Sequence, residues 1–124
     1  MARNVSPYES AEQIALFKWA EYCAKTRPEL ALLHHIPNGG SRNLKEAHNL
    51  RLQGVKAGVP DICLPVPKGS FHGMYIELKR TRGGIVSKDQ KLWIDRLSNL
   101  GYKAVVCNGW DAARKVIEEY LHQT

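Results

Sequence analysis

The pattern of apolar and polar positions along the chain predicts helices and strands in the order α-β-α-β-β-α-β-α. Helices are expected over residues 6–27, 43–53, 87–100 and 111–121. Strands are expected over the short apolar segments 30–37, 61–66, 74–80 and 102–107. The segments between them are rich in Gly, Pro, Asn and Ser, and they are expected to be turns and loops.

Local signals set several of the helix boundaries. Ser6 followed by Pro7 is typical of an N-cap and the first helical position. Ser87 and Gln90 have the spacing of a capping box at the start of the third helix. Asp111 is expected to cap the last helix.

The strands at 61–66 and 74–80 are joined by the turn "PKGSFHG" and should therefore pair antiparallel. Short strands that alternate with helices imply an α/β fold in which helices flank a mixed sheet. No repeat or linker divides the chain. Its 124 residues, 44% of them hydrophobic, suit a single domain over residues 1–124.

The strand at 74–80 carries charge on one of its two faces. Side chains two positions apart share a face, so Met74, Ile76 and Leu78 should pack together against a helix. Glu77 and Lys79 then lie side by side on the opposite face. A pair of this kind on a strand is usually a solvated surface pair, and this plainer explanation stays open here.

Asp61 enters the neighbouring strand directly after Pro60. Because antiparallel strands place the start of one beside the end of the other, Asp61 is expected near Glu77 and Lys79. Two close carboxylates repel each other unless a cation lies between them, and oxygen ligands suit Mg²⁺ or Mn²⁺. Lys79 would hold the attacking water or stabilise charge on a phosphate. These residues therefore predict a site that hydrolyses phosphodiesters, although a single Pro-Asp is also common in turns.

His34 and His35 form a second candidate metal pair. Adjacent side chains on a strand face opposite ways, so the two rings cannot bind one ion together. Each histidine is instead expected to be packed or to contact a loop.

Net charge, cysteine content and hydropathy indicate the class of partner and the cellular compartment. The chain has 18 Lys and Arg against 12 Asp and Glu, a net charge of +6 that favours nucleic acid over a membrane, although many basic domains bind neither. Cys23, Cys63 and Cys107 lie far apart in apolar surroundings, as reduced core cysteines do. The sequence has no apolar segment of transmembrane length and no signal-peptide core, so a cytoplasmic protein without a membrane partner is expected.

Four ordered pieces of the sequence resemble the VRR-NUC family of the PD-(D/E)XK nuclease superfamily. They are Glu12-Gln13 in the first helix, "GVPD" at 58–61, "IELK" at 76–79 and "SKDQ" at 87–90. The stretch "IPNGG" at 36–40 is similar to small stand-alone members from phages and bacteria. The resemblance covers nearly the whole chain. It implies a restriction-endonuclease-like α/β fold with an αβββαβ core, in which helix 43–53 is an insertion.

The resemblance implies a DNA endonuclease that depends on Mg²⁺ or Mn²⁺. Residues that match Asp61 and Glu77 bind metal in the family, and the backbone carbonyl of Leu78 would be a further ligand. The residue that matches Lys79 assists the nucleophilic water.

Glu12 and Gln90 complete the implied catalytic set. Glu12 matches the acidic residue of the first helix, although Glu9 lies one turn earlier on nearly the same face. Either acid also suits a helix N-terminus without any catalytic role. Gln90 matches the family's glutamine, whose amide would touch the metal-bound water or a phosphate, but it also completes the capping box.

Two basic loops, one over 38–43 and one directly after the charged strand, are expected to hold the DNA backbone. The candidate DNA contacts are Asn38, Gly39, Gly40, Arg42, Arg80, Arg82 and Lys88. Each of them also occurs as an ordinary solvated surface residue.

Small stand-alone VRR-NUC proteins resemble Holliday junction resolvases, so a structure-selective endonuclease that acts on branched DNA is the leading interpretation. Symmetric cutting of a four-way junction needs two active sites, which predicts a homodimer. The alternatives are a flap- or nick-directed nuclease, a restriction-type nuclease, a DNA-binding module without catalytic activity, and a structural or interaction protein.

Overall fold

The computed structural model describes residues 7–37 and 43–123. Its helices are α1 (Pro7–Cys23), the 3-10 helix η1 (Pro28–Leu32), α2 (Leu44–Leu52), α3 (Lys88–Asn99) and α4 (Trp110–Leu121). Its strands are β1 (His34–His35), β2 (Ile62–Leu64), β3 (Met74–Lys79) and β4 (Lys103–Asn108). Within these ranges no helix is both long and apolar enough to cross a membrane.

The strands form one mixed sheet in the order β1-β2-β3-β4. β2 is antiparallel to both β1 and β3, and the short turn between β2 and β3 explains the second pairing. β3 and β4 are parallel, a pairing that needs a crossover, and α3 provides it. The expected α/β fold is confirmed: α1, the four strands and α3 follow one another as αβββαβ, and α2 is inserted between β1 and β2.

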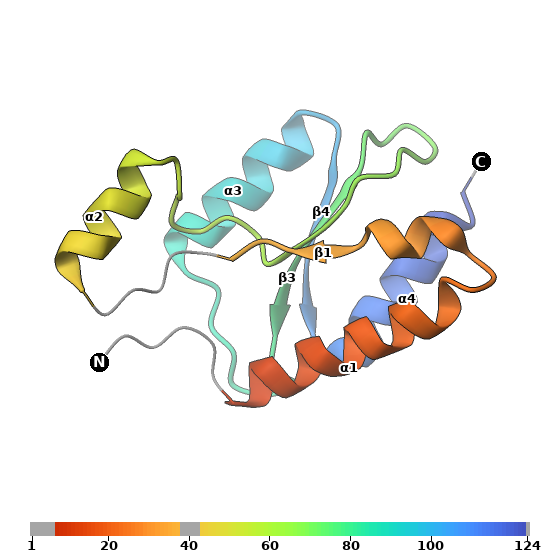
Figure 1. Cartoon of the computed structure of the whole chain (residues 1–124). Helices are drawn as coiled ribbons and strands as arrows, with labels where there is room; N and C mark the ends of the chain where they lie inside the picture. Colours follow the sequence, from red (N-terminus) through yellow and green to blue (C-terminus); the bar gives the residue numbers. More distant parts are fainter. Residues whose placement is uncertain (1–6, 38–42, 124) are drawn as a thin grey trace.

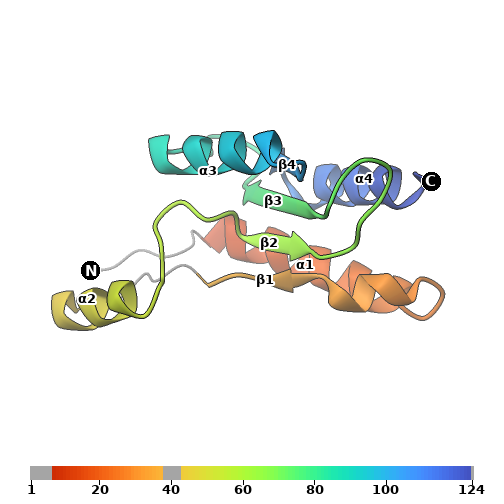
Figure 2. The same cartoon turned by 90° about the horizontal axis from the view of Figure 1, so that it is seen from above.

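α1 and α4 lie side by side along one face of the sheet (Figure 1). The core between these helices and the sheet contains Met74, Ile76 and Leu78 of β3, as the strand alternation predicts. α3 packs on β4 from the other face, on which Glu77 lies. α2 lies at one end of the molecule, away from the sheet, and none of its residues is buried (Figure 2).

The segment 30–37 was expected to be a strand, and this expectation is wrong for its first half. Residues 28–32 form η1, and strand geometry is limited to His34–His35. Pro28 favours a helical turn because its ring fixes φ. Leu30 and Leu33, three positions apart, are then both buried in the core. An apolar run alone does not distinguish a strand from a buried helical turn.

Two helix ends also differ from expectation. α1 ends at Cys23, four residues before the expected end. α4 begins at Trp110 with Gly109 as its N-cap, so Asp111 lies inside the first turn and is not the cap. Because Gly109 has no side chain, the start of α4 takes its cap from elsewhere in the fold.

Candidate active site

The structure brings Asp61, Glu77 and Lys79 together at the junction of β2 and β3. Asp61 directly precedes β2, whose Ile62 pairs with Ile76 of β3. The Leu78 backbone N–H donates a hydrogen bond of 2.9 Å to Asp61 Oδ2, which fixes the Asp61 carboxylate against β3. Lys79 Nζ lies 3.4 Å from Glu77 Oε2. The strand register therefore produces the expected cluster of two carboxylates and one ammonium.

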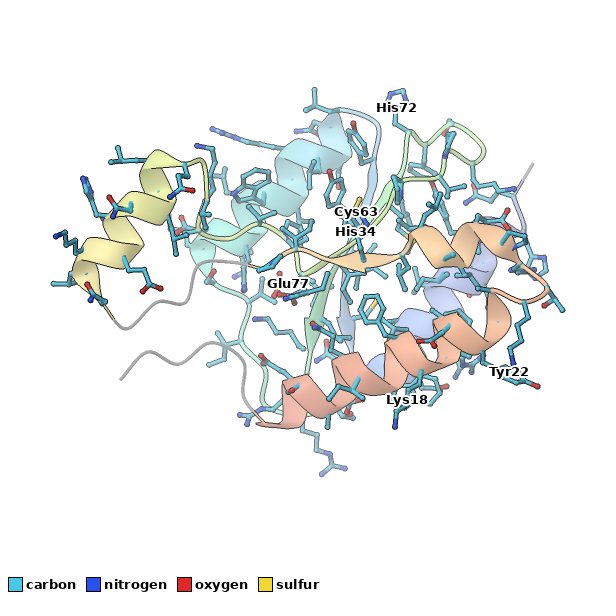
Figure 3. The ribbon with its side chains drawn as sticks, in the orientation of Figure 1. Lys18, Tyr22, His34, Cys63, His72 and Glu77 are labelled. Carbon is cyan, nitrogen blue, oxygen red and sulfur yellow. The ribbon has the colours of Figure 1, made fainter. Side chains whose placement is uncertain are left out.

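Glu77 is buried, with only 2% of its surface exposed (Figure 3). The pKa of Glu77 is raised from 4.5 to about 8, mainly by burial and then by the nearby Asp61 charge, while Lys79 acts in the opposite direction. Glu77 Oε1 is buried and has no hydrogen-bond partner among the described residues. A buried carboxylate oxygen of this kind needs a proton or a cation.

Gln90 serves two purposes at the start of α3. It forms the expected capping box with Ser87, in which Gln90 N donates to Ser87 Oγ and Ser87 N donates to Gln90 Oε1. The Nε2 nitrogen of the same side-chain amide donates a 2.9 Å hydrogen bond to Glu77 Oε2. The helix cap therefore also orients the buried carboxylate.

The "GVPD" segment is fixed on α3 by contacts that no local pattern in the sequence indicates. Gly58 has a φ of +89°, and a Cβ there would lie 2.6 Å from the backbone carbon of Asp89. Trp93 Nε1 donates a 3.0 Å hydrogen bond to the Ala57 carbonyl. At position 58, only glycine permits both the positive φ and the close approach to the Asp89 backbone. These contacts set the position from which the chain enters β2 at Asp61.

The loop after β3 packs on the stem of Lys79. A Cβ at Gly84 would lie 2.8 Å from Lys79 Cβ, so the loop backbone touches the lysine side chain directly. Arg80 donates a 3.1 Å hydrogen bond to the Gly83 carbonyl, which closes the loop on itself. Gly84 therefore lets the loop pack against the stem of Lys79, and in the sequence the only signal of this contact is the glycine pair of "TRGG".

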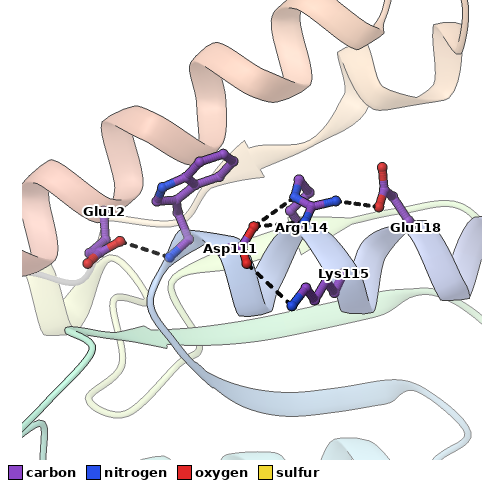
Figure 4. A network of polar contacts seen from close by, with 6 residues as sticks. Glu12, Asp111, Arg114, Lys115 and Glu118 are labelled. Carbon is purple, nitrogen blue, oxygen red and sulfur yellow. Dashed lines mark hydrogen bonds and ion pairs between the residues drawn. The ribbon is translucent and has the colours of Figure 1, made fainter.

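Glu12 belongs to α1, and its side chain contacts the start of α4 (Figure 4). Its Oε1 accepts a 2.9 Å hydrogen bond from Trp110 N, and its Oε2 accepts a 3.0 Å hydrogen bond from Thr81 Oγ1. Glu12 thus supplies the cap that Gly109 lacks. These hydrogen bonds join α1, α4 and the loop after β3, and neither involves Asp61 or Glu77.

Of the expected DNA contacts, Arg80, Arg82 and Lys88 lie within the described residues. Glu12, Arg80, Thr81 and Arg82 line a pocket of about 340 Å³ just beyond the end of β3. Lys88 is exposed in the first turn of α3. The other expected contacts lie outside the described residues, and they are Asn38, Gly39, Gly40 and Arg42.

Comparisons with known proteins identify the family of this chain. The VRR-NUC domain family matches residues 5–111. A solved structure described as a "VRR_NUC domain protein" is 33% identical to the chain, with a TM-score of 0.81 over 93% of this chain and 88% of that chain. No curated protein gives a significant match. The chain therefore belongs to the VRR-NUC family of nuclease domains.

Proposed function

We propose that the protein is a Mg²⁺- or Mn²⁺-dependent endonuclease that hydrolyses phosphodiester bonds in DNA. Membership of the VRR-NUC family supports action on DNA in general. The observation that carries the metal-dependent chemistry is Glu77, which is buried beside Asp61 with one oxygen that no described residue hydrogen-bonds. A divalent cation would compensate both carboxylates at once.

The residues at this site fit a hard cation. Asp61, Glu77 and the backbone carbonyl of Leu78 would hold the ion through oxygen atoms. The described residues contain no group of three or more His, Cys, Asp or Glu side chains arranged around a common point. Mg²⁺ commonly takes only one or two carboxylates and keeps several waters. When bound, such an ion stabilises negative charge on the phosphate and lowers the pKa of a bound water.

The remaining residues of the proposed site act on the water or phosphate and on the Glu77 carboxylate. The Lys79 ammonium, 3.4 Å from Glu77, donates a hydrogen bond to the attacking water or to a phosphate oxygen. Gln90 holds the Glu77 carboxylate in place through its amide. The family resemblance adds Glu12 of α1 to this catalytic set.

The substrate that we propose is branched DNA, with a four-way junction as the leading form. The proposed phosphate contacts come from the loop over 38–43, the loop after β3 and the start of α3, and they are Asn38, Gly39, Gly40, Arg42, Arg80, Arg82 and Lys88. Paired cuts across a junction require two sites of this kind, so we propose that the protein acts as a homodimer.

The test is cleavage of a labelled four-way junction beside flap, nicked and linear duplexes of matched sequence, with Mg²⁺, Mn²⁺ or EDTA. Wild type is compared with Lys79→Ala and with Lys18→Ala, a control that removes an exposed lysine of α1. We expect paired, metal-dependent cuts in the junction that are lost in Lys79→Ala and kept in Lys18→Ala.

Other outcomes lead to specific alternatives. Cutting of flaps, nicks or linear duplex would keep the chemistry and change the substrate. Tight DNA binding without cutting in either metal would show a binding module without catalytic activity. In light scattering, the mass of one chain for the free protein, together with one chain per junction in the complex, would contradict the homodimer.

A further inference from the structure

The two adjacent histidines of β1 make different contacts, as their opposite orientation requires. His34 is exposed, and its Nδ1 lies 2.9 Å from the Leu32 carbonyl (Figure 3). His35 is half-buried, and its Nδ1 lies 2.8 Å from the carbonyl oxygen of Asp61. A carbonyl oxygen only accepts hydrogen bonds, so Nδ1 of each ring is the protonated nitrogen.

The contact of His35 is to the backbone of a proposed metal ligand. The Asp61 carbonyl also accepts a 2.7 Å hydrogen bond from the Ile36 backbone N–H, which extends the β1–β2 pairing by one step. On its other side, Asp61 Oδ2 accepts from the Leu78 N–H of β3. Asp61 is therefore held from both neighbouring strands: β1 holds its backbone and β3 holds its carboxylate.

We propose that His35 is a positioning residue that fixes Asp61 for divalent-cation binding; this inference rests on the proposed function. Asp61 directly precedes β2, and on the β1 side its carbonyl is held by the Ile36 N–H and by the His35 ring. The His35 ring makes its contact across the sheet and does not need to touch the ion itself. Partners of this kind typically change metal affinity by about 10- to 100-fold when they are removed.

The first measurement is Mn²⁺ binding by isothermal titration calorimetry, without DNA. His35→Ala should bind Mn²⁺ about tenfold more weakly than wild type, at the lower end of that range because His35 acts through the backbone. His35→Asn places an amide donor close to the position of Nδ1, and it should recover most of the affinity. His34→Ala is the matched control and should bind like wild type.

The second measurement needs no metal. Asp61 accepts the Leu78 amide N–H, so a loosened Asp61 should expose that amide to hydrogen exchange. In EDTA, the Leu78 amide should exchange faster in His35→Ala than in wild type or His34→Ala. Amides of α4 should keep their wild-type rates, which separates this local effect from a loss of global stability.

The outcomes distinguish the two proposals. If wild type does not bind Mn²⁺, or if Asp61→Asn binds it as tightly as wild type, the proposed metal site is wrong and the role of His35 falls with it. If wild type binds Mn²⁺ and His35→Ala binds it equally well, the metal site stands and the role of His35 is overturned. Equal losses in His35→Ala and His35→Asn would also overturn it, because the amide donor would then have restored nothing.

Discussion

At the scale of single residues, the site depends on a carboxylate that the fold keeps out of water. Glu77 is 2% exposed and shares its surroundings with Asp61 and Lys79. Residues with shifted pKa values in such surroundings are typical of functional sites, because the folded chain tolerates the charge only when a partner compensates it. Glu77 Oε1 has no hydrogen-bond partner among residues 7–37 and 43–123, so the described part of the chain does not complete this compensation.

Glu77 should make the stability of the metal-free protein depend on pH. Its pKa rises from 4.5 to about 8 in the folded chain, mainly through burial. A group with a raised pKa stabilises the fold fully below pH 4.5, and this contribution is lost as the pH rises through about 8. At about 1.4 kcal/mol per pKa unit, the loss amounts to a few kcal/mol.

Thermal unfolding in EDTA across this range measures the effect. We expect the unfolding temperature of wild type to fall towards alkaline pH, and Glu77→Gln to flatten the curve because its amide does not ionise. Glu119→Gln, a change at an exposed residue of α4, should leave the wild-type dependence in place. Parallel curves for wild type and Glu77→Gln would show that another group causes the dependence.

Gly84 should control activity through its contact with Lys79. Gly84→Ala places a Cβ 2.8 Å from Lys79 Cβ, so the lysine stem or the loop must shift. A displacement of about 1 Å in a catalytic group can reduce the rate by up to about 100-fold. Cleavage assays should show this loss while the unfolding temperature changes little.

The control for this substitution is Gly73→Ala, just before the other end of the same strand. A Cβ at Gly73 would approach no nearer than 3.4 Å to its neighbours, an ordinary contact. Gly73→Ala should therefore keep its activity. If Gly84→Ala cleaved DNA as fast as Gly73→Ala, the loop would have no part in placing Lys79.

At the scale of elements, one polar side chain connects α1 to the start of α4. Glu12 caps α4 through Trp110 N and binds Thr81, so it joins two helices and the loop after β3. Glu12→Ala removes the cap and should destabilise the fold by about 1 kcal/mol. Denaturant unfolding in EDTA measures this structural role separately from any catalytic one.

Glu21→Ala, at an exposed residue of the same helix, serves as the control and should be close to neutral. Glu12→Gln keeps an oxygen that can accept from Trp110 N and should retain most of the stability. Cleavage by Glu12→Gln then tests the catalytic role that the resemblance implies. An unchanged unfolding free energy in Glu12→Ala would contradict the cap.

The elements also show what the sequence could predict. The period-2 alternation of β3 and the Ser87–Gln90 capping box depend on neighbours in the chain, and both are present in the fold. The cap of α4 comes from Glu12, 98 residues away in the chain, and no local pattern at Gly109 indicates it. The same limit applies to His35 and Asp61, which meet only because β1 pairs with β2.

At the scale of the whole molecule, the apolar core and the candidate active site lie on opposite faces of the sheet. One face, with α1 and α4, contains the apolar core, and the other face, with the start of α3, contains Glu77 and Gln90. Arg80 and Arg82 line a pocket just beyond β3, so positive charge continues from the site along the strand direction. A net charge of +6 adds a general attraction for DNA to this local arrangement.

DNA binding should therefore weaken with salt, and Arg82 should account for part of that dependence. Each phosphate contact contributes about −0.9 to the slope of log K against log salt concentration. Arg82 is exposed and lines the pocket, whereas Arg80 already donates to Gly83. In EDTA, where no cleavage is expected, Arg82→Ala should reduce the slope by about 1 per bound chain. Arg96→Ala, at an exposed residue in the last turn of α3, should keep the wild-type slope, and equal slopes for all three proteins would exclude Arg82 as a phosphate contact.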